Sequence, residues 1–198
     1  MTVTGESDED LMMRYGRGDA AAFETLYRRH EMRVWRYLER NVGNRAAADD
    51  LMQEVWFAVA RDAARYSPTA RFTTWLFTIA HNRMIDHFRA SGHLTVVSAD
   101  DEVHEEAVIA LPGARSMQPE SRAENRELRE RLRAAVAALP PAQREAFLLQ
   151  QEAEMSLAEI AAVTGAGVET VKSRLRYALS KLRSELADLD EDLQEGLR

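Results

Sequence analysis

Apolar side chains recur at intervals of three and four residues along most of this 198-residue chain, and no stretch alternates apolar with polar residues as a strand would. Ala, Leu, Arg and Glu are plentiful, whereas Val and Ile are sparse. We therefore expect an all-α protein. Glycine and proline breaks divide it into helices that start near residues 8, 20, 46 and 73, and again near 120, 143, 156 and 168.

The composition changes between the two groups of helices. From residue 96 to 126 there are seven acidic and three basic residues, and Pro112, Gly113 and Pro119 interrupt any long helix. Such a segment is typical of an irregular linker. We expect an N-terminal helical bundle over 8–93, a flexible acidic linker over 94–121 and a C-terminal helix-turn-helix domain over 122–190.

Charge and cysteine usage restrict the function classes. The formal net charge is −7, yet residues 170–183 hold five basic side chains and no acidic one. A chain with this balance should bind DNA poorly alone, because phosphate neutralisation supplies most non-specific affinity. The absence of Cys excludes disulfides and thiolate metal sites. With no basic, apolar leader and no apolar run of about 20 residues, we expect a cytoplasmic protein that does not enter membranes.

The segment from Ser156 to Arg183 has helix-turn-helix spacing: a short helix, a turn with glycines at 165 and 167, and a longer helix. Ser156 and Glu159 form the capping-box pattern that starts a helix. The longer helix should bury one face, made of Val168, Val171, Leu175, Leu179, Leu182 and Leu186. Its other face is polar with basic flanks, which suits base edges and phosphates in a major groove. A solvated amphipathic helix is the alternative.

The helix around Asp50 carries an exposed aromatic residue in a polar surround. Its core face is expected to be Leu51, Met52, Val55, Trp56 and Val59. Phe57 then lies on the opposite face, among polar residues, as an anchor in an interface does. A single surface Phe is also common without any partner, so periodicity leaves both interpretations open.

Residues 65–89 interleave aromatic and arginine side chains, a composition that suits single-stranded nucleic acid, where rings stack on bases. The alternative is that Phe72, Trp75 and Ile79 are core residues at helical spacing. The five His form no metal-binding spacing, and no nucleophile–base set or phosphate loop is present. We expect no metal, no cofactor and no enzyme activity.

Several of these blocks, in this order and spacing, carry a family resemblance. Residues 18–30, 48–56 (ADDLMQEVW) and 72–89 form the N-terminal blocks, and residues 139–147 and 159–175 form the C-terminal ones. They resemble the extracytoplasmic-function, or group four, sigma factors of bacterial RNA polymerase. The resemblance covers most of the chain outside the linker. It implies a sigma factor that directs core polymerase to promoters and helps open them.

The resemblance also implies residue roles. The residues that face the clamp helices of the largest polymerase subunit would be Asp50, Gln53, Glu54 and Phe57. The residues that bind the minus-ten element and capture a flipped base would be Tyr66, Arg71, Phe72, Trp75, Asn82, Arg83, Asp86 and Arg89. The residues that read the minus-thirty-five element as a duplex would be Glu169, Thr170, Lys172, Ser173, Arg174, Arg176, Tyr177 and Lys181. Further implied partners are the flap of the second-largest subunit and an anti-sigma factor.

Three positions depart from the family pattern. Glu169 stands where Gly is frequent, Gly167 where Pro is common, and His81 where Arg is frequent. The first two alter the start of the recognition helix, so a base preference cannot be transferred. Two rival functions remain at this point: an autonomous helix-turn-helix regulator, and an enzyme with a DNA-binding tail. The acidic balance and the absence of a ligand domain disfavour the first, and the absence of a catalytic set disfavours the second.

Overall fold

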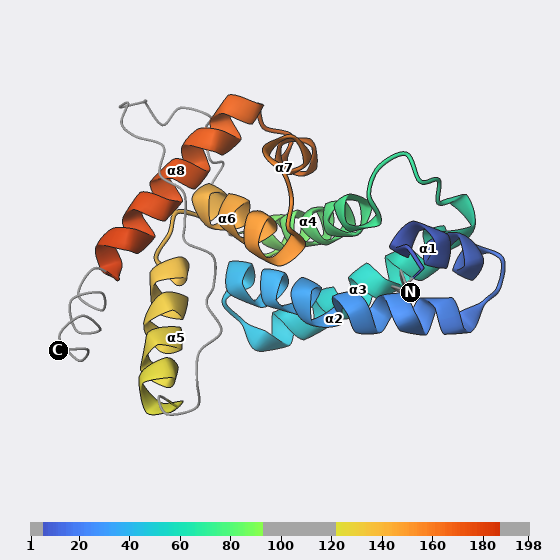
Figure 1. The fold of residues 1–198 in the computed structure, drawn as a ribbon, viewed down its shortest axis with the longest axis horizontal. Coiled ribbons are helices and arrows are strands. Elements are labelled where there is room, and N and C mark those ends of the chain that lie inside the picture. Colours follow the sequence, from blue (N-terminus) through green and yellow to red (C-terminus); the bar gives the residue numbers. More distant parts are fainter. Residues whose placement is uncertain (1–5, 93–121, 187–198) are drawn as a thin grey trace, which may run out of the picture.

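A computed structural model of the chain describes residues 6–92 and 122–186, with side chains described only from residue 128 in the second range. The described residues form α-helices, one short 3-10 helix and no strand, which confirms the all-α prediction. The predicted linker 94–121 lies entirely outside the described residues. Figure 1 shows two groups of helices that lie against each other.

The N-terminal unit contains four α-helices and a 3-10 helix: α1 (Asp8–Gly16), α2 (Ala20–Val42), α3 (Arg45–Asp62), η1 (Ala63–Arg65) and α4 (Phe72–Ala90). Local capping fixes most of their ends. The Asp19 carboxylate accepts hydrogen bonds from the N–H groups of Ala21 and Ala22 and starts α2, and Gly43 ends it at a φ of 66°. The long helix α2 packs against α1, α3 and α4, so it forms the centre of this unit.

The C-terminal unit contains α5 (Arg122–Ala137), α6 (Pro141–Ala153), α7 (Leu157–Thr164) and α8 (Val168–Glu185). Helix α6 begins at Pro141, two residues earlier than expected, because proline has no N–H to leave unpaired in a first turn. The predicted capping box at Ser156 and Glu159 is present, and Gly165 ends α7 at a φ of 68°. The helix-turn-helix of α7 and α8 is confirmed.

The predicted core face of α3 is confirmed, since its five apolar residues are all buried. The predicted apolar face of α8 is only partly right. Val171, Leu175 and Leu182 are buried, but Val168 is 44% exposed. Val168 is the first residue of the helix, so no preceding turn of α8 covers it.

The two units meet along a seam, which we define as the contact of α2 and α4 with α6 and α7. Buried apolar residues of both units form one continuous cluster. Polar groups are buried at the seam as well. Of the five buried polar residues among those described, three take part in hydrogen bonds across it or beside it: Asn41, Thr74 and Glu152.

Candidate functional site

The polar face of α3 is fully presented to solvent. Asp50, Gln53 and Glu54 are exposed, and the ring of Phe57 is 73% exposed. Phe57 is the most exposed large apolar side chain among the described residues. Removing so much of an aromatic ring from water would be favourable, so this face can act as a docking surface around one apolar anchor.

The loop between η1 and α4 is held by a group of aromatic rings in edge contact. Tyr66 makes edge contacts with Phe72, at a centroid distance of 6.2 Å, and with Trp75, at 5.0 Å. The hydroxyl of Tyr66 is buried and has no hydrogen-bond partner among the described residues. Its burial, together with the charges of Glu9 and Asp8, raises the pKa of Tyr66 to about 12, so the hydroxyl stays protonated at neutral pH.

Phe72 does not have the position expected of a DNA-contacting residue. Its side chain is completely buried beneath Tyr66 and against His30, with a ring-centroid distance of 5.4 Å to His30. The aromatic pattern left a core role open, and the structure places the ring in the core. Its part in the loop is therefore structural support from below.

The other predicted minus-ten residues divide into two groups. Asn82, Asp86 and Arg89 are exposed along one stripe of α4, with Trp75 and Arg83 partly buried beside it. Arg89 pairs with Asp86 at 3.2 Å. Arg71 is exposed but turned towards the C-terminal unit, where it donates to the Glu154 carbonyl oxygen at 3.3 Å and lies 3.6 Å from the Glu159 carboxylate.

The base of this loop includes residues that the sequence did not indicate. The backbone N–H of Phe72 donates to Oε1 of Glu9 at 2.6 Å, although the two residues are 63 positions apart. Beside it, Asp8 lies 2.7 Å from Nε2 of the buried His30 and also accepts from Arg29. Burial alone would raise the pKa of Asp8, but the hydrogen bonds from His30 and Arg29 hold it below its usual value.

The predicted minus-thirty-five residues all lie on one helix, α8. Glu169, Thr170, Lys172 and Lys181 are exposed, and the remainder of the set is partly buried: Ser173, Arg174, Arg176 and Tyr177. Their contacts differ. The guanidinium of Arg176 lies 5.0 Å from the ring centroid of Tyr177. Lys181 donates to the Ala138 carbonyl at 3.1 Å and so fastens α8 to the end of α5.

Two glutamates of α6 concentrate the polar contacts of the seam. Glu152 is 7% exposed and accepts from Arg36 and Arg40, both at 2.8 Å. Glu145 accepts from the Tyr37 hydroxyl at 2.7 Å and lies 2.6 Å from Nδ1 of His81. Burial, with the charge of Glu145, raises the pKa of Tyr37 well above its usual value. His81, which departs from the family pattern, thus lies at the seam.

Within residues 6–92 and 122–186 no group of three or more His, Cys, Asp or Glu side chains could hold a metal ion. In the same part of the chain, no helix has the length and apolar character needed to cross a bilayer.

Comparison with known protein families and sequences agrees with this architecture. Residues 26–93 match Sigma-70 region 2, and residues 129–182 match Sigma-70 region 4. The chain is 34% identical to the RNA polymerase sigma factor CarQ of Myxococcus xanthus, over 90% of this chain and 97% of CarQ. It is 32% identical to the ECF RNA polymerase sigma factor SigL of Mycobacterium tuberculosis, over 86% of this chain and 92% of SigL.

Solved structures share the fold. CnrH, in complex with the cytosolic domain of CnrY, superposes with a TM-score of 0.63 at 27% identity, over 93% of this chain and 99% of that one. The sigma factor RpoE of Bartonella quintana, in complex with the anti-sigma factor NepR, gives a TM-score of 0.61 at 22% identity, over 83% and 96%. The chain therefore belongs to the extracytoplasmic-function family of sigma factors, which direct RNA polymerase to promoters for transcription initiation.

Proposed function

We propose that the exposed face of α3 docks this sigma factor on the clamp helices of the largest polymerase subunit. The observation that carries this assignment is the 73% exposure of Phe57, with Asp50, Gln53 and Glu54 exposed on the same helix. An apolar ring surrounded by polar groups has the composition of an interface hot spot. In the C-terminal unit, the corresponding partner is the flap of the second-largest subunit.

We further propose that the loop 66–71 and the exposed stripe of α4 capture a flipped base of the minus-ten element. Extruding a base costs a few kcal/mol, which a pocket lined by rings and hydrogen-bonding groups can return. Tyr66 in the loop and Trp75 on α4 supply rings, and Asn82 supplies an exposed amide about two turns further along α4. Arg83 and Arg89 lie on the same helix as Asn82, where they can contact the phosphates of the captured strand.

The polar face of α8 is proposed to read the minus-thirty-five element as a duplex. Thr170 and Ser173 offer hydroxyl groups in the first turns of the helix, which is the end that enters the major groove in helix-turn-helix proteins. Arg174 and Arg176 flank them and suit phosphates on the rims. No catalytic step falls to this chain in such a mechanism, because bond formation belongs to the polymerase.

A regulatory partner and a cellular location complete the proposal. CnrH and the Bartonella RpoE are each bound to another protein, which is an anti-sigma factor in the second case. We expect an anti-sigma factor to hold this chain too and to cover its polymerase-facing helices. We also place its action in the cytoplasm, where core polymerase and promoter DNA are found.

The docking assignment is tested by replacing its anchor. Phe57→Ala should weaken binding to core polymerase roughly 30-fold or more, because a desolvated aromatic anchor contributes about 2 kcal/mol. Met32→Ala on α2 is the matched control, since Met32 is also an exposed large apolar residue and lies outside α3 and the C-terminal unit. Unchanged core affinity of the Phe57→Ala protein, with normal circular dichroism, would remove this face from the docking model.

The two DNA assignments are separated by one further variant. Asn82→Ala should leave duplex binding by the holoenzyme intact and reduce promoter opening, measured by permanganate reactivity of unpaired thymines. Transcription from core polymerase, promoter and purified protein is the accompanying assay. Normal opening by Asn82→Ala at every promoter tested would show that this amide does not take part in base capture.

A further inference from the structure

We propose that α1 is a brace for the base-capture loop, with Glu9 as the residue that positions the loop's exit into α4. Helix α1 lies outside the segment that matches the region 2 family model, which begins at residue 26. The inference rests on the proposed role of loop 66–71. It adds a second element, distant in sequence, that determines the shape of that loop.

The first observation is that α4 depends on Glu9 for its N-terminal cap. The first N–H groups of a helix lack partners within the helix, and a neighbouring side chain usually supplies one. Arg71, at the N-cap position of α4, makes no such hydrogen bond with its own side chain. The carboxylate of Glu9 takes that place, at 2.6 Å from the Phe72 nitrogen, and its negative charge suits the positive end of the helix.

The second observation concerns the opposite end of α1. Gly16 is so close to η1 that a Cβ atom placed there would lie 2.7 Å from the carbonyl oxygen of Ala63. Ala63 precedes the loop and Phe72 follows it. The two ends of α1 therefore contact the two ends of the loop, with Gly16 at its entry and Glu9 at its exit.

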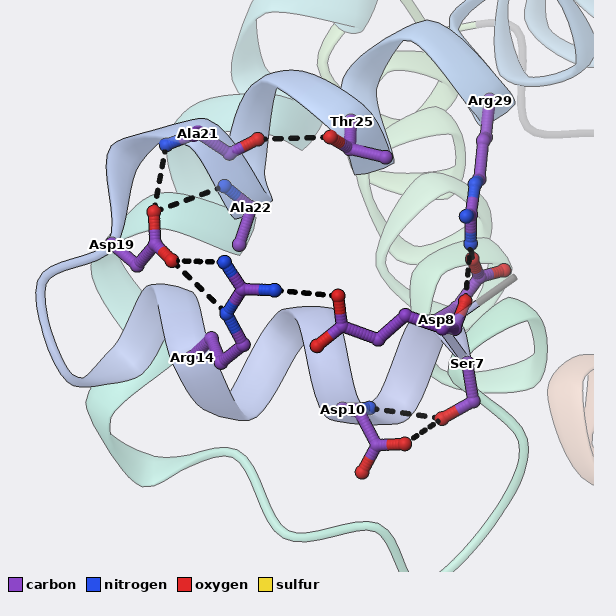
Figure 2. Close-up of polar contacts among 10 residues, drawn as sticks. Ser7, Asp8, Asp10, Arg14, Asp19, Ala21, Ala22, Thr25 and Arg29 are labelled. Atoms are coloured by element: carbon purple, nitrogen blue, oxygen red, sulfur yellow. Dashed lines mark hydrogen bonds and ion pairs between the residues drawn. The ribbon is translucent and has the colours of Figure 1, made fainter. Parts of the chain in front are cut away.

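The third observation is that α1 is anchored in the core by the buried Leu11 and Met12 and is joined to α2 by polar contacts. Ser7 caps its first turn by accepting from the N–H of Asp10, and Arg14 pairs with both Glu6 and Asp19. Figure 2 shows these contacts along α1, together with the pair that joins Asp8 to Arg29 of α2. A helix fixed at both ends to α2 can transmit that fixed position to the loop.

A brace matters here because the loop has little covering of its own. Side chains 67–70 are exposed, so the positions of residues 63 and 72 largely determine the path between them. A base pocket requires its groups to be held within a fraction of an ångström, and a displacement of about 1 Å in a positioned group can cost about 100-fold in rate. Glu9 does not touch DNA in this scheme. It acts through the backbone of Phe72.

The test uses holoenzyme reconstituted from core polymerase and full-length variants. Glu9→Ala removes the acceptor and should reduce permanganate-detected opening about tenfold, in line with the loss of a helix cap. Affinity for core polymerase should stay within about twofold, since the α3 face is unaltered. Glu9→Gln keeps an amide oxygen at the same reach and should restore most of the opening. Glu24→Ala on α2, an exposed acid that pairs with Arg28 and lies outside α1, is the matched control.

A further variant covers the case in which Glu9→Ala does not fold. Glu9→Asp keeps the charge at the start of α1 but shortens the side chain by one methylene, so its carboxylate falls short of the Phe72 N–H. Opening by Glu9→Asp should then fall while its urea unfolding midpoint changes little. Wild-type opening by a folded Glu9→Ala or Glu9→Asp protein would overturn the proposal.

The parallel Asn82→Ala measurement separates the base-capture proposal from the brace proposal. Impaired opening by Asn82→Ala with normal opening by the Glu9 variants would refute the brace and leave the base-capture assignment standing. Normal opening by Asn82→Ala and by the Glu9 variants would refute both. Impaired opening by Glu9→Ala with rescue by Glu9→Gln supports a hydrogen bond as the means of positioning, since a loss of helix charge would not be rescued by the amide.

Discussion

The two surfaces proposed to meet DNA are constructed in different ways. The recognition face of α8 comes from residues 169–181 of one helix, oriented by the adjacent turn at Gly165. The base-capture surface is assembled from α1, η1, a loop and α4, with a hydrogen bond that joins residues 63 positions apart. The first surface is local and the second is distributed. A substitution in α8 should therefore act at its own contact, whereas one beneath the loop should disturb several residues together.

Replacing Phe72 should have the largest effect on stability and on promoter opening. Phe72→Ala deletes a fully buried ring on which Tyr66, Trp75 and His30 pack, and large-to-small core changes of this kind cost about 3–5 kcal/mol. We expect a much lower urea midpoint for the N-terminal unit and no promoter opening. Trp35→Phe is a milder control away from the loop, where the hydrogen bond to Asp49 and part of a partly buried ring are lost. Near-normal stability of Phe72→Ala would mean that the loop does not depend on its underlying core.

Replacing either of two glycines should have an effect of intermediate size on stability, and the pair compares the two surfaces. Gly16→Ala forces a Cβ against a backbone oxygen and should cost about 1–3 kcal/mol through overpacking. Gly165→Ala meets no atom within 4 Å, but its φ of 68° should cost about 1–2 kcal/mol. Denaturant titration compares the stabilities. Gly16→Ala should impair opening, and Gly165→Ala should impair minus-thirty-five binding; the reverse pattern would contradict the division between the two surfaces.

Removing single contacts of α8 should have smaller effects, confined to minus-thirty-five binding. Arg176→Ala and Ser173→Ala should each reduce minus-thirty-five affinity of the holoenzyme by about 1–3 kcal/mol, with stability unchanged. Ser173 and Arg176 are neighbours on the helix, so additivity is tested with Arg176→Ala and Thr170→Ala, which lie about 9 Å apart along the axis and whose effects should add if the surface is local. Filter binding on promoters with altered minus-thirty-five sequence gives the measurement, and strong coupling between the two substitutions would break the comparison.

The smallest expected effect is a dependence on acid pH beneath the loop. The folded-state pKa of Asp8 is below its ordinary value of 3.8, because hydrogen bonds from His30 and Arg29 outweigh the effect of burial. The stability that this carboxylate contributes is therefore present above about pH 4 and is lost as the pH falls through its lower folded value. Urea midpoints of wild type and Asp8→Asn should differ at pH 7 and converge as the pH falls from about 4 through the folded value. A constant difference would show that Asp8 acts without its charge.

The sequence was sufficient to predict structural features that depend on residues close together along the chain. The spacing of Leu51, Val55 and Val59 predicted a buried face of α3, and Ser156 with Glu159 predicted a helix start. It was insufficient where distant segments meet. The cap that Glu9 provides for α4 has no local signal, because Glu9 looks like any acid in a first helical turn. Phe72 was assigned to DNA by resemblance, although only the packing of His30 and Tyr66 shows that it is covered.

The buried Glu152 has a consequence for the length of promoter that the chain can span. Through its pairs with Arg36 and Arg40, α6 is fixed beside α2, and Thr74 of α4 donates to Glu159 of α7 at 2.9 Å. Elements centred ten and thirty-five bases upstream of a start site are separated by about 25 base pairs, or roughly 85 Å at about 3.4 Å each. A compact chain of 198 residues has a radius of gyration of about 16 Å, so two units held side by side do not span that interval. If the two units read both elements at once as proposed, the contacts of Glu152 and Glu159 across the seam must part when the promoter is bound.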